Sequence, residues 1–524
     1  MRILVAEPLA AAGYKLLQSQ TGWEVIQSTP KEFAQYLPCA DALIVRSAVK
    51  VDATVLSQAP KLRVIGRAGV GVDNVDLPAA TSAGVLVMNT PGGNAVSVAE
   101  QTIAFMLSLA RSIPQANAST KSGKWEKKKF MGTELRGKTL GVVGLGSIGR
   151  EVVKRAKAFE MRIIASDPFV NAQTAKDVGV ELVDLPVLFA QSDYITLHTA
   201  LTPESQHLLS GDAFQKMKKG VRIINCARGE LIKEAALGEA ITSGHVSGAA
   251  LDVFEKEPPD PNDALLKLDA VIATPHIGGS TEEAQEIVGL RIAEQVVEYL
   301  KSGVALNAVN MPALTPEQFR TLGPYVELAE RLGTLASQVA SSNPKAVRLI
   351  YCGRIAEQNT HLVRNAGLAG VLSRSLAIRA NSINAMQIAG DRGLAVAERH
   401  DRRSAHVDSV RLELETDKGL TSVEGAVVMG KPRLIQIDGI QCEAPLDGHV
   451  TFLKNSDVPG VIGYIGSVFG KNAINIATFS LGRQDAGKEA VSVIETDQPV
   501  TDSVLGQLLE NPAVKLARAV EFAR

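Results

Sequence analysis

The sequence has few cysteines, and they lie far apart. The four of them, Cys39, Cys226, Cys352 and Cys442, form no C-x-x-C pair. This spacing argues against a zinc motif or a disulfide framework, and we expect no metal site. Scattered cysteines are typical of a reducing compartment, which predicts a cytoplasmic location.

Long apolar runs and an excess of charge are also missing. The opening stretch MRILVAEPLA is short and is interrupted by Glu7, so it does not have the apolar region of a signal peptide. No stretch approaches the roughly 18 apolar residues of a membrane span. The net charge of −1 gives no electrostatic footprint for nucleic acid. We therefore expect neither a membrane nor a nucleic acid as a partner.

The chain is long enough for several domains, because 524 residues exceed what one hydrophobic core supports. The first 310 residues alternate short β-rich runs with helical patterns, which indicates βα units and parallel sheets. The β-rich runs of a first series are RILVAE, WEVIQS, ALIVRS, LRVIGRAG and VLVMNTPGG, and those of a second series are TLGVVGLG, RIIASDP, YITLHTA, RIINCARG, GAALDVF and AVIATPHIGG.

Two long helical patterns bracket the second series. They are VAEQTIAFMLSLARSI and STEEAQEIVGLRIAEQVVEYLKSG, and the capping-box pattern Ser280-x-x-Glu283 opens the second one. The predicted fold class is α/β, with two doubly wound parallel-sheet (Rossmann-like) domains, one inserted in the other. Residues 1–97 and 283–310 form the outer domain, residues 98–282 form the inserted one, and a cleft lies between them.

The texture of the sequence changes after residue 310. NMPALTPEQ contains two prolines and is typical of a linker. Residues 311–446 mix a helical pattern with β-like runs and predict an intervening α+β domain. Residues 447–524 follow the order strand, helix, strand, strand, helix, strand, which is the ferredoxin-like βαββαβ plan.

A glycine-rich turn lies near the start of the second series. The stretch GLGSIG, Gly144 to Gly149, matches G-x-G-x-x-G, follows the strand-like run TLGVV and begins a helical pattern. The glycines let a pyrophosphate approach the N-terminus of the helix. Asp167 ends the next predicted strand, where it should accept hydrogen bonds from the ribose hydroxyls and repel a 2′-phosphate. The turn therefore predicts NAD, rather than NADP, as the cofactor.

Polar residues gather where the strands of the second series end, which is where parallel sheets bind ligands. They are His198-Thr199, Cys226-Ala227-Arg228, Asp252 to Glu257 and His276-Ile277-Gly278-Gly279. This set suits oxidation of a hydroxy acid: a base takes the hydroxyl proton, a guanidinium holds the carboxylate, and an acid stabilises the cationic base. His276 is the better base because two glycines follow it, and His198 is its competitor. Glu255 and Glu257 both remain candidates for the acid.

The outer domain has the same kind of strand ends. They carry Arg46-Ser47, Arg67-Ala68-Gly69 and Asn89-Thr90-Pro91-Gly92-Gly93-Asn94. Two arginines at one edge of a sheet suit a dianionic substrate.

Together these motifs resemble the D-isomer-specific 2-hydroxyacid dehydrogenases. The stretches that carry the resemblance are GRAGVGVDNVD, NTPGGN, GVVGLGSIGR, INCARGE, ALDVFEKEP and TPHIGGST. In that family the arginine of C-A-R-G binds the substrate, the glutamate of E-P pairs with the histidine, and the histidine of P-H-I-G-G is the acid–base. The resemblance thus implies Arg228, Glu257 and His276 as catalytic residues.

The resemblance also implies the remaining contacts. Those expected for the cofactor are Val70, Gly144, Gly146, Ser147, Ile148, Gly149, Asp167, His198, Thr199, Cys226, Ala227, Arg228, Asp252, His276, Gly278 and Gly279. Those expected for the substrate are Arg46, Ser47, Arg67, Gly69, Asn89 and Lys127, the arginines on its phosphate and the lysine from a neighbouring subunit. Val70 stands where the family often has threonine, so only its backbone is left for the cofactor phosphate.

The later part of the chain is similar to the long members of that family. KPRLIQIDGIQCEAPLDGH resembles the exit of their intervening domain, and NSDVPGVIGYIGSVFGKNAINIATF resembles the regulatory module called ACT. In that module L-serine binds at a dimer interface, near the positions of Asp457 and Asn475. The resemblance implies a homodimer or homotetramer that oxidises 3-phospho-D-glycerate to 3-phosphohydroxypyruvate, the first step of L-serine biosynthesis, with serine-linked regulation.

Two other functions stay open. One is a different D-2-hydroxyacid dehydrogenase, such as a glycerate or glyoxylate reductase, whose usual members lack the later domains. The other is a non-catalytic NAD-sensing interaction protein, a branch without the ACT tail.

Overall fold

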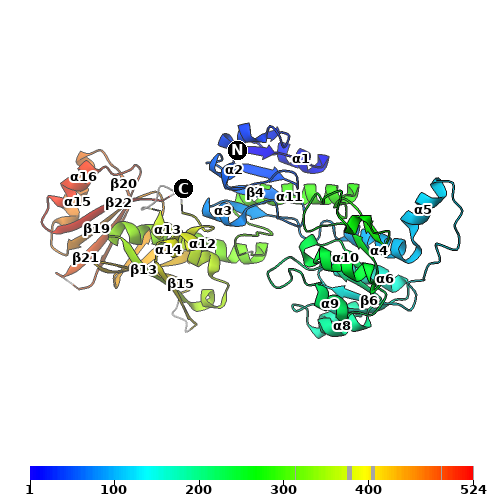
Figure 1. Ribbon diagram of the computed structural model, residues 1–524. Helices are drawn as coiled ribbons and strands as arrows, with labels where there is room; N and C mark the ends of the chain where they lie inside the picture. The colour runs from blue at the N-terminus through cyan, green and yellow to red at the C-terminus, as the bar shows by residue number, and fades with distance from the viewer. Residues whose placement is uncertain (313, 341, 374–379, 403–406, 486, 523–524) are drawn as a thin grey trace.

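The computed structural model describes residues 1–312, 314–340, 342–373, 380–402, 407–485 and 487–522. Its strands form four sheets, and each sheet is confined to one stretch of the chain. Figure 1 shows the elements of the first 310 residues (blue to green) grouped together and the later elements (yellow to red) grouped at their side. Over the described residues, every helix is too short or too polar to span a bilayer.

The first sheet has five parallel strands in the order β2-β1-β3-β4-β5. Strand β3 is buried along its whole length, as expected where helices cover both faces of a parallel sheet. The strands are β1 (Arg2–Val5), β2 (Glu24–Gln27), β3 (Ala42–Val45), β4 (Val64–Arg67) and β5 (Leu86–Met88), and the helices of this stretch are α1 (Ala11–Gln18), η1 (Phe33–Cys39), α2 (Ala53–Ser57) and α3 (Leu77–Ser82).

Helix α11 (Glu282–Ser302) returns the chain to this first sheet. Its Val288, Ile292 and Val296 share one hydrophobic core with strands β1 and β3. The capping-box prediction is wrong by one residue: the hydroxyl of Thr281 accepts a hydrogen bond from the backbone N–H of Ala284 at 3.2 Å. Ser280 instead donates its own backbone N–H to a turn.

The second sheet has seven parallel strands in the order β12-β11-β10-β9-β6-β7-β8. Six correspond to the predicted β-rich runs, and the seventh, β8, has only two residues and forms the edge. The strands are β6 (Thr139–Val143), β7 (Arg162–Ser166), β8 (Glu181–Leu182), β9 (Tyr194–Leu197), β10 (Val221–Asn225), β11 (Val246–Leu251) and β12 (Val271–Ala273), and the helices are α4 (Ala95–Arg111), α5 (Ile113–Lys121), α6 (Ser147–Ala158), α7 (Ala172–Val178), α8 (Leu185–Gln191), α9 (Gly211–Lys216), η2 (Gly229–Leu231), α10 (Glu234–Thr242) and η3 (Leu265–Lys267).

The register of this second sheet places the strand ends side by side. Leu197 of β9 pairs with Val143 of β6 and with Asn225 of β10, and Asn225 pairs in turn with Leu251 of β11. Leu251 also pairs with Ala273 of β12. The residues that directly follow these five positions therefore gather at one edge of the sheet.

The later residues form a mixed sheet and an antiparallel sheet. The mixed sheet has the order β14-β13-β15-β16-β17-β18, and the last sheet has the order β20-β21-β19-β22 within a βαββαβ unit. The strands are β13 (Pro344–Cys352), β14 (Ala395–Asp401), β15 (Ser409–Thr416), β16 (Gly419–Val428), β17 (Lys431–Ile437), β18 (Ile440–Pro445), β19 (His449–Ser456), β20 (Ile476–Arg483), β21 (Glu489–Thr496) and β22 (Val514–Glu521), and the helices are α12 (Pro316–Ala340), η4 (Gly353–Glu357), α13 (His361–Leu372), α14 (Ala385–Asp391), α15 (Val461–Lys471) and α16 (Asp502–Leu509).

Helix α12 begins inside the stretch predicted as a linker. The backbone N–H of Gln318 donates to the hydroxyl of Thr315 at 3.2 Å, and the side-chain oxygen of Gln318 accepts from the backbone N–H of Thr315 at 2.9 Å. This reciprocal pair is a capping box. It starts the helix at Pro316, which is the second proline of that stretch.

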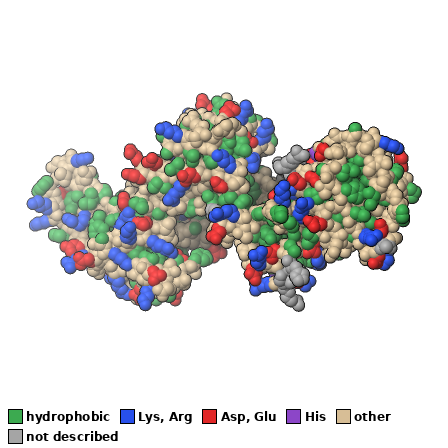
Figure 2. Space-filling model, turned by 180° about the vertical axis from the view of Figure 1, so that it is seen from behind, with side chains coloured by type: hydrophobic (Ala, Val, Ile, Leu, Met, Phe, Trp, Pro, Cys, Tyr) green, Lys and Arg blue, Asp and Glu red, His purple; other side chains and the backbone are tan. Residues whose placement is uncertain are grey.

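One hydrophobic core joins the mixed sheet to the C-terminal sheet. It contains Leu332 of α12 and Leu412 of β15, and also Phe452 of β19, Val493 of β21 and Val520 of β22. Outside this core the surface is mixed in charge, and acidic and basic side chains intermingle on the face seen in Figure 2. The C-terminal βαββαβ unit therefore shares a hydrophobic core with the preceding mixed sheet.

Candidate active site

A cleft of about 830 Å³ lies where the ends of the two parallel sheets face each other. Most of the predicted site residues line it: Arg46, Ser47, Arg67, Gly69, Val70, Gly146, Ser147, Ile148, His198, Thr199, Cys226, Ala227, Arg228, Asp252, Glu257, His276, Gly278 and Gly279. Both sheets contribute, as the strand-end pattern predicts.

The glycine-rich turn forms one end of the cleft. Gly144 has a φ of 94°, and a Cβ on Gly149 would lie 2.1 Å from the carbonyl oxygen of Gly144, so both positions require glycine. Gly146 precedes helix α6, whose N-terminus has no side-chain cap, and a Cβ there would point into open space. Uncapped N–H groups beside open space suit a pyrophosphate, so this turn fits a dinucleotide.

Asp167 follows strand β7 and lies beside the glycine-rich turn. One of its carboxylate oxygens accepts from the backbone N–H of Leu145 and the other from that of Phe169, both at 2.8 Å. Asp167 lines a separate pocket between β7 and the start of α8. Its carboxylate is thus held next to the turn, in a place suited to ribose hydroxyls.

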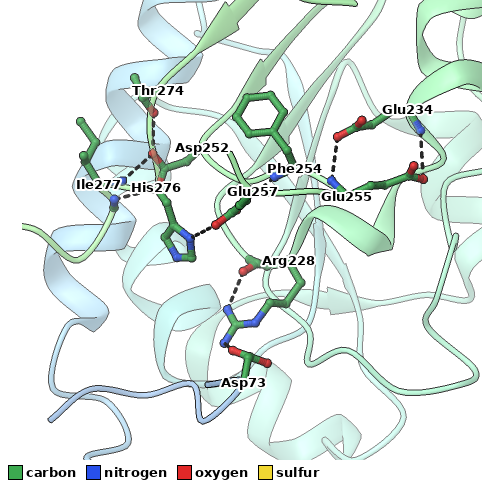
Figure 3. A network of polar contacts seen from close by, with 12 residues as sticks. Asp73, Arg228, Glu234, Asp252, Phe254, Glu255, Glu257, Thr274, His276 and Ile277 are labelled. Carbon is green, nitrogen blue, oxygen red and sulfur yellow. Dashed lines mark hydrogen bonds and ion pairs between the residues drawn. The ribbon is translucent and has the colours of Figure 1, made fainter. Parts of the chain in front are cut away.

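His276 and Glu257 form a hydrogen-bonded pair in the same cleft (Figure 3). Nδ1 of His276 lies 2.8 Å from Oε2 of Glu257, and the other Glu257 oxygen accepts from the N–H of Phe254 at 3.2 Å. The hydrogen bond to Glu257 raises the pKa of His276 above its ordinary value, despite burial. Burial alone would raise the pKa of Glu257, but the hydrogen bond and charge of His276 outweigh it and lower that pKa.

Contacts in the structure distinguish Glu255 from Glu257, and His198 from His276. Glu255 pairs with His207 at 3.1 Å, whereas Glu257 pairs with His276. Nε2 of His198 lies 2.9 Å from the hydroxyl of Thr196, and burial lowers the pKa of His198 to about 3. A histidine with so low a pKa does not accept a proton near neutral pH, so the geometry favours His276 and Glu257.

Asp252 holds the loop that carries His276. Its carboxylate accepts the backbone N–H of Ile277 at 2.9 Å and that of Gly278 at 2.7 Å, and it also accepts the hydroxyl of Thr274. The side chain is buried, and His276 itself has a φ of 53°, a left-handed conformation that costs energy outside glycine. Asp252 therefore stabilises a strained loop (Figure 3).

Cys226 lines the cleft, and its buried thiol is unreactive. Burial raises the pKa of its thiol to about 12, so the thiol stays protonated at neutral pH. The arginine two residues later is the charged group that strand β10 presents to the cleft.

Three arginines, Arg46, Arg67 and Arg228, line the cleft. Nη2 of Arg228 pairs with the carboxylate of Asp73 at 2.8 Å. Burial, and next the charge of Arg228, lower the pKa of Arg67. The backbone N–H of Arg46 donates to the buried carboxylate of Glu7 at 2.8 Å, which places Arg46 at the rim. Three guanidinium groups thus share the cleft with the carboxylates of Asp73, Asp252 and Glu257.

Some lining residues have no counterpart in the sequence predictions. Asp73 and Gln285 are two of them. Asn94, which ends the strand-end stretch Asn89 to Asn94, lines the cleft as well. Oδ1 of Asn94 is buried and has no hydrogen-bond partner within the described part of the chain. A polar atom in this state is a candidate ligand contact, and it belongs to a strand-end stretch that the sequence already indicated.

Several predicted residues lie outside the cleft. Asn89 supports its wall from behind, because its amide donates to the carbonyl of Val70 at 2.5 Å. Lys127 lies over the ring of Trp125 in the segment after α5. Asp457 pairs with Arg483 at 3.1 Å in the C-terminal sheet. The amide of Asn475, also in that unit, donates to Asp497 at 2.7 Å.

Three family descriptions match successive parts of the chain. "D-isomer specific 2-hydroxyacid dehydrogenase, NAD binding domain" matches residues 103–278, "D-3-phosphoglycerate dehydrogenase intervening domain" matches residues 321–438, and "ACT domain" matches residues 449–513. The matches follow the order of the last three sheets.

The chain is also similar to proteins of known name along its full length. It is 44% identical to the D-3-phosphoglycerate dehydrogenase of Methanocaldococcus jannaschii over 517 residues, covering 98% of each chain. It is 43% identical to that of Archaeoglobus fulgidus, covering 100% of each chain. Among solved structures, D-lactate dehydrogenase from Aquifex aeolicus with NAD and lactic acid is 28% identical, with a TM-score of 0.53 over 60% of this chain and 100% of that one.

Proposed function

The chain belongs to the D-3-phosphoglycerate dehydrogenases, NAD-dependent oxidoreductases of serine biosynthesis, and from this membership we propose how its cleft oxidises 3-phospho-D-glycerate to 3-phosphohydroxypyruvate. One observation carries the proposal. The His276–Glu257 pair and three arginines share a single cleft with an uncapped, glycine-rich helix N-terminus.

Different residues of the cleft bind different groups of the substrate. Arg228 holds the carboxylate, since a guanidinium presents a fixed fork of donors to such a group. Arg46 and Arg67 hold the phosphate, whose two negative charges offset the burial and the repulsion by Arg228 that together lower the pKa of Arg67. Two anchors of this kind orient the hydroxyl-bearing carbon toward His276 and the glycine-rich turn.

His276 moves the proton. Its Nδ1 is engaged by Glu257, which leaves Nε2 as the nitrogen for the substrate hydroxyl. As the hydroxyl proton passes to Nε2, the carboxylate of Glu257 stabilises the imidazolium that forms. NAD, when bound, accepts the hydride from the same carbon. In the reverse direction His276 returns the proton.

The residues of the inserted domain hold the dinucleotide. Gly144, Gly146 and Gly149 leave room for the pyrophosphate, and Asp167 faces the ribose hydroxyls. The negative charge of Asp167 disfavours a 2′-phosphate and supports NAD over NADP. Cys226 packs at the nicotinamide end without thiol chemistry.

We further propose that the enzyme is a cytoplasmic homodimer or homotetramer. Helix α5 buries no residue, and the following segment exposes Trp125 by 76% and Met131 by 86%. This segment projects from the body of the protein in Figure 1. A second subunit that covers it would receive Lys127 near its own cleft. All four cysteines are free thiols, which supports a reducing compartment.

L-serine is the proposed effector of the ACT domain. Asp457 directly follows β19 and Asn475 directly precedes β20. One oxygen of Asp457 accepts from Arg483 and from the backbone N–H of Gly487, and the amide of Asn475 donates to Asp497. Both side chains retain free lone pairs or donors for an amino acid.

The test of the main proposal is NADH formation with 3-phospho-D-glycerate, beside D-glycerate and D-lactate. Arg67→Ala should raise KM for the phosphorylated substrate far more than for D-glycerate, because only the former has a phosphate. Folded protein that reduces NAD with D-glycerate or D-lactate but not with phosphoglycerate would sink the proposed substrate. Turnover with none of the three would favour the NAD-sensing alternative.

A further inference from the structure

Arg228 is held by a carboxylate from the opposite wall of the cleft. Arg228 follows strand β10 of the seven-stranded sheet, whereas Asp73 follows strand β4 of the five-stranded sheet. Nη2 of Arg228 and Oδ2 of Asp73 lie 2.8 Å apart (Figure 3). The ion pair therefore connects residues that follow strands of two different sheets, across the cleft between them.

The guanidinium of Arg228 is held at both of its terminal nitrogens. Nη1 donates to the carbonyl of Ala227 at 2.6 Å, while Nη2 meets Asp73. An arginine side chain loses about 2 kcal/mol of rotamer entropy when it is ordered. Two contacts that order it before the substrate arrives remove part of that cost from binding.

The contact with Asp73 leaves donors for a substrate. A guanidinium has five N–H groups, of which Ala227 and Asp73 take one each. The remaining donors, on Nε and on the terminal nitrogens, are enough for a carboxylate to bind beside Asp73. The Asp73 side chain is 66% exposed and sits at the edge of the guanidinium rather than over it.

Gly71, two residues before Asp73, leaves room for this ion pair. A Cβ on Gly71 would lie 2.0 Å from Nη2 of Arg228 and 2.7 Å from Oδ2 of Asp73. Any side chain at position 71 would therefore push the two groups apart. The negative charge of Asp73 also acts on Arg67, and so it offsets part of the repulsion between Arg67 and Arg228.

We propose that Asp73 is a positioning residue, which reaches across the cleft and holds the guanidinium of Arg228 in place for the substrate carboxylate. This inference rests on the proposed function, in which Arg228 binds the substrate. The opposite role, a carboxylate that competes with the substrate for Arg228, makes a prediction of opposite sign.

The experiment is steady-state kinetics on the full-length enzyme with Asp73→Asn. An exposed charge pair contributes up to about 1 kcal/mol, so KM for 3-phospho-D-glycerate should rise roughly fivefold. We expect kcat to stay within about twofold and KM for NAD to stay unchanged, because chemistry and cofactor do not depend on this contact. Asp73→Glu keeps the carboxylate and should recover most of the lost affinity.

A matched control removes a similar ion pair elsewhere in the same sheet. Glu24 pairs with Arg2 at 2.7 Å, also on the surface, but outside the cleft. Glu24→Gln should leave both KM values unchanged. Thermal melting of Asp73→Asn and Glu24→Gln should agree with the wild type, which separates a loss of positioning from a loss of folding.

A double mutant tests whether the two groups act through one contact. Gly71→Ala should raise KM as Asp73→Asn does, and the combination should be no worse than the more severe single change. A lower KM in Asp73→Asn, or an unchanged one, overturns the inference. Arg228→Ala separates a failure of the proposed function from a failure of the role of Asp73. If Arg228→Ala abolishes turnover while Asp73→Asn leaves KM unchanged, the proposed function stands and only the role of Asp73 fails.

Discussion

Nδ1 of His276 donates to Oε2 of Glu257 across 2.8 Å, and the backbone N–H of Phe254 holds the other oxygen of the same carboxylate. The pair sets which nitrogen of the ring is free and how strongly the ring holds a proton. It raises the pKa of His276, and it does so at the rim of a cleft that also holds the arginines.

The first prediction concerns pH. His276 must be neutral to accept the hydroxyl proton, and its pKa is raised, so kcat/KM for oxidation should increase with pH through a midpoint above the ordinary histidine value of about 6.5. Glu257→Gln removes the negative charge. The midpoint should then move to lower pH while the plateau falls, because the imidazolium loses its support. A pH–rate profile with an unmoved midpoint would show that Glu257 does not act on this histidine.

The second prediction concerns the proton acceptor itself. His276→Ala should lower kcat by roughly 10²–10⁴-fold, which is the usual contribution of a positioned general base. The circular dichroism spectrum and the melting temperature should stay close to the wild type and serve as the control for folding. A near-normal rate would mean that another group takes the proton, and His198→Ala would be the next variant.

The third prediction concerns the buried carboxylate of Asp252. Asp252→Asn places an NH₂ group against one of the two backbone N–H donors, Ile277 or Gly278. Leaving a buried donor unsatisfied should lower the free energy of unfolding by about 1–3 kcal/mol, measured in urea. The strained loop at His276 should also lose order, so kcat should fall. Asp212→Asn, on an exposed position in α9, is the matched control and should change neither quantity.

The fourth prediction concerns the C-terminal sheet. Asp457→Ala and Asn475→Ala should each weaken L-serine binding to the full-length enzyme, measured by calorimetry, without changing KM for the substrate. Asp485, which pairs with Lys488 on the surface nearby, provides the control variant Asp485→Ala. If serine binds equally well to all three variants, the effector site lies elsewhere.

The strand-end chemistry of the cleft could be predicted because it follows from local patterns. A run such as RIINCARG contains both the buried strand and the arginine at its end, and parallel register brings such ends together. The same logic predicted His276, Asp252 and the glycine-rich turn. The choice between Glu255 and Glu257 needed more than spacing, because both lie in one short loop and only the fold determines which side of it faces His276.

Features that depend on contacts between distant segments had no local signal. Asp73 contacts Arg228 only because the two parallel sheets face each other. Gln285 lines the cleft from helix α11, which packs against the five-stranded sheet. The helix caps show the limit at short range. Ser280 and Thr281 are both good caps, and the turn geometry selects the second. Strand β8 is too short to show a period of two.

The core that joins the mixed sheet to the C-terminal sheet has a consequence for shortening the protein. Phe452, Val493 and Val520 are buried against the preceding domain. A gene cut between the two would leave apolar surface exposed on both pieces, which favours aggregation of each. Removing the C-terminal domain alone should therefore make the shortened protein prone to aggregation.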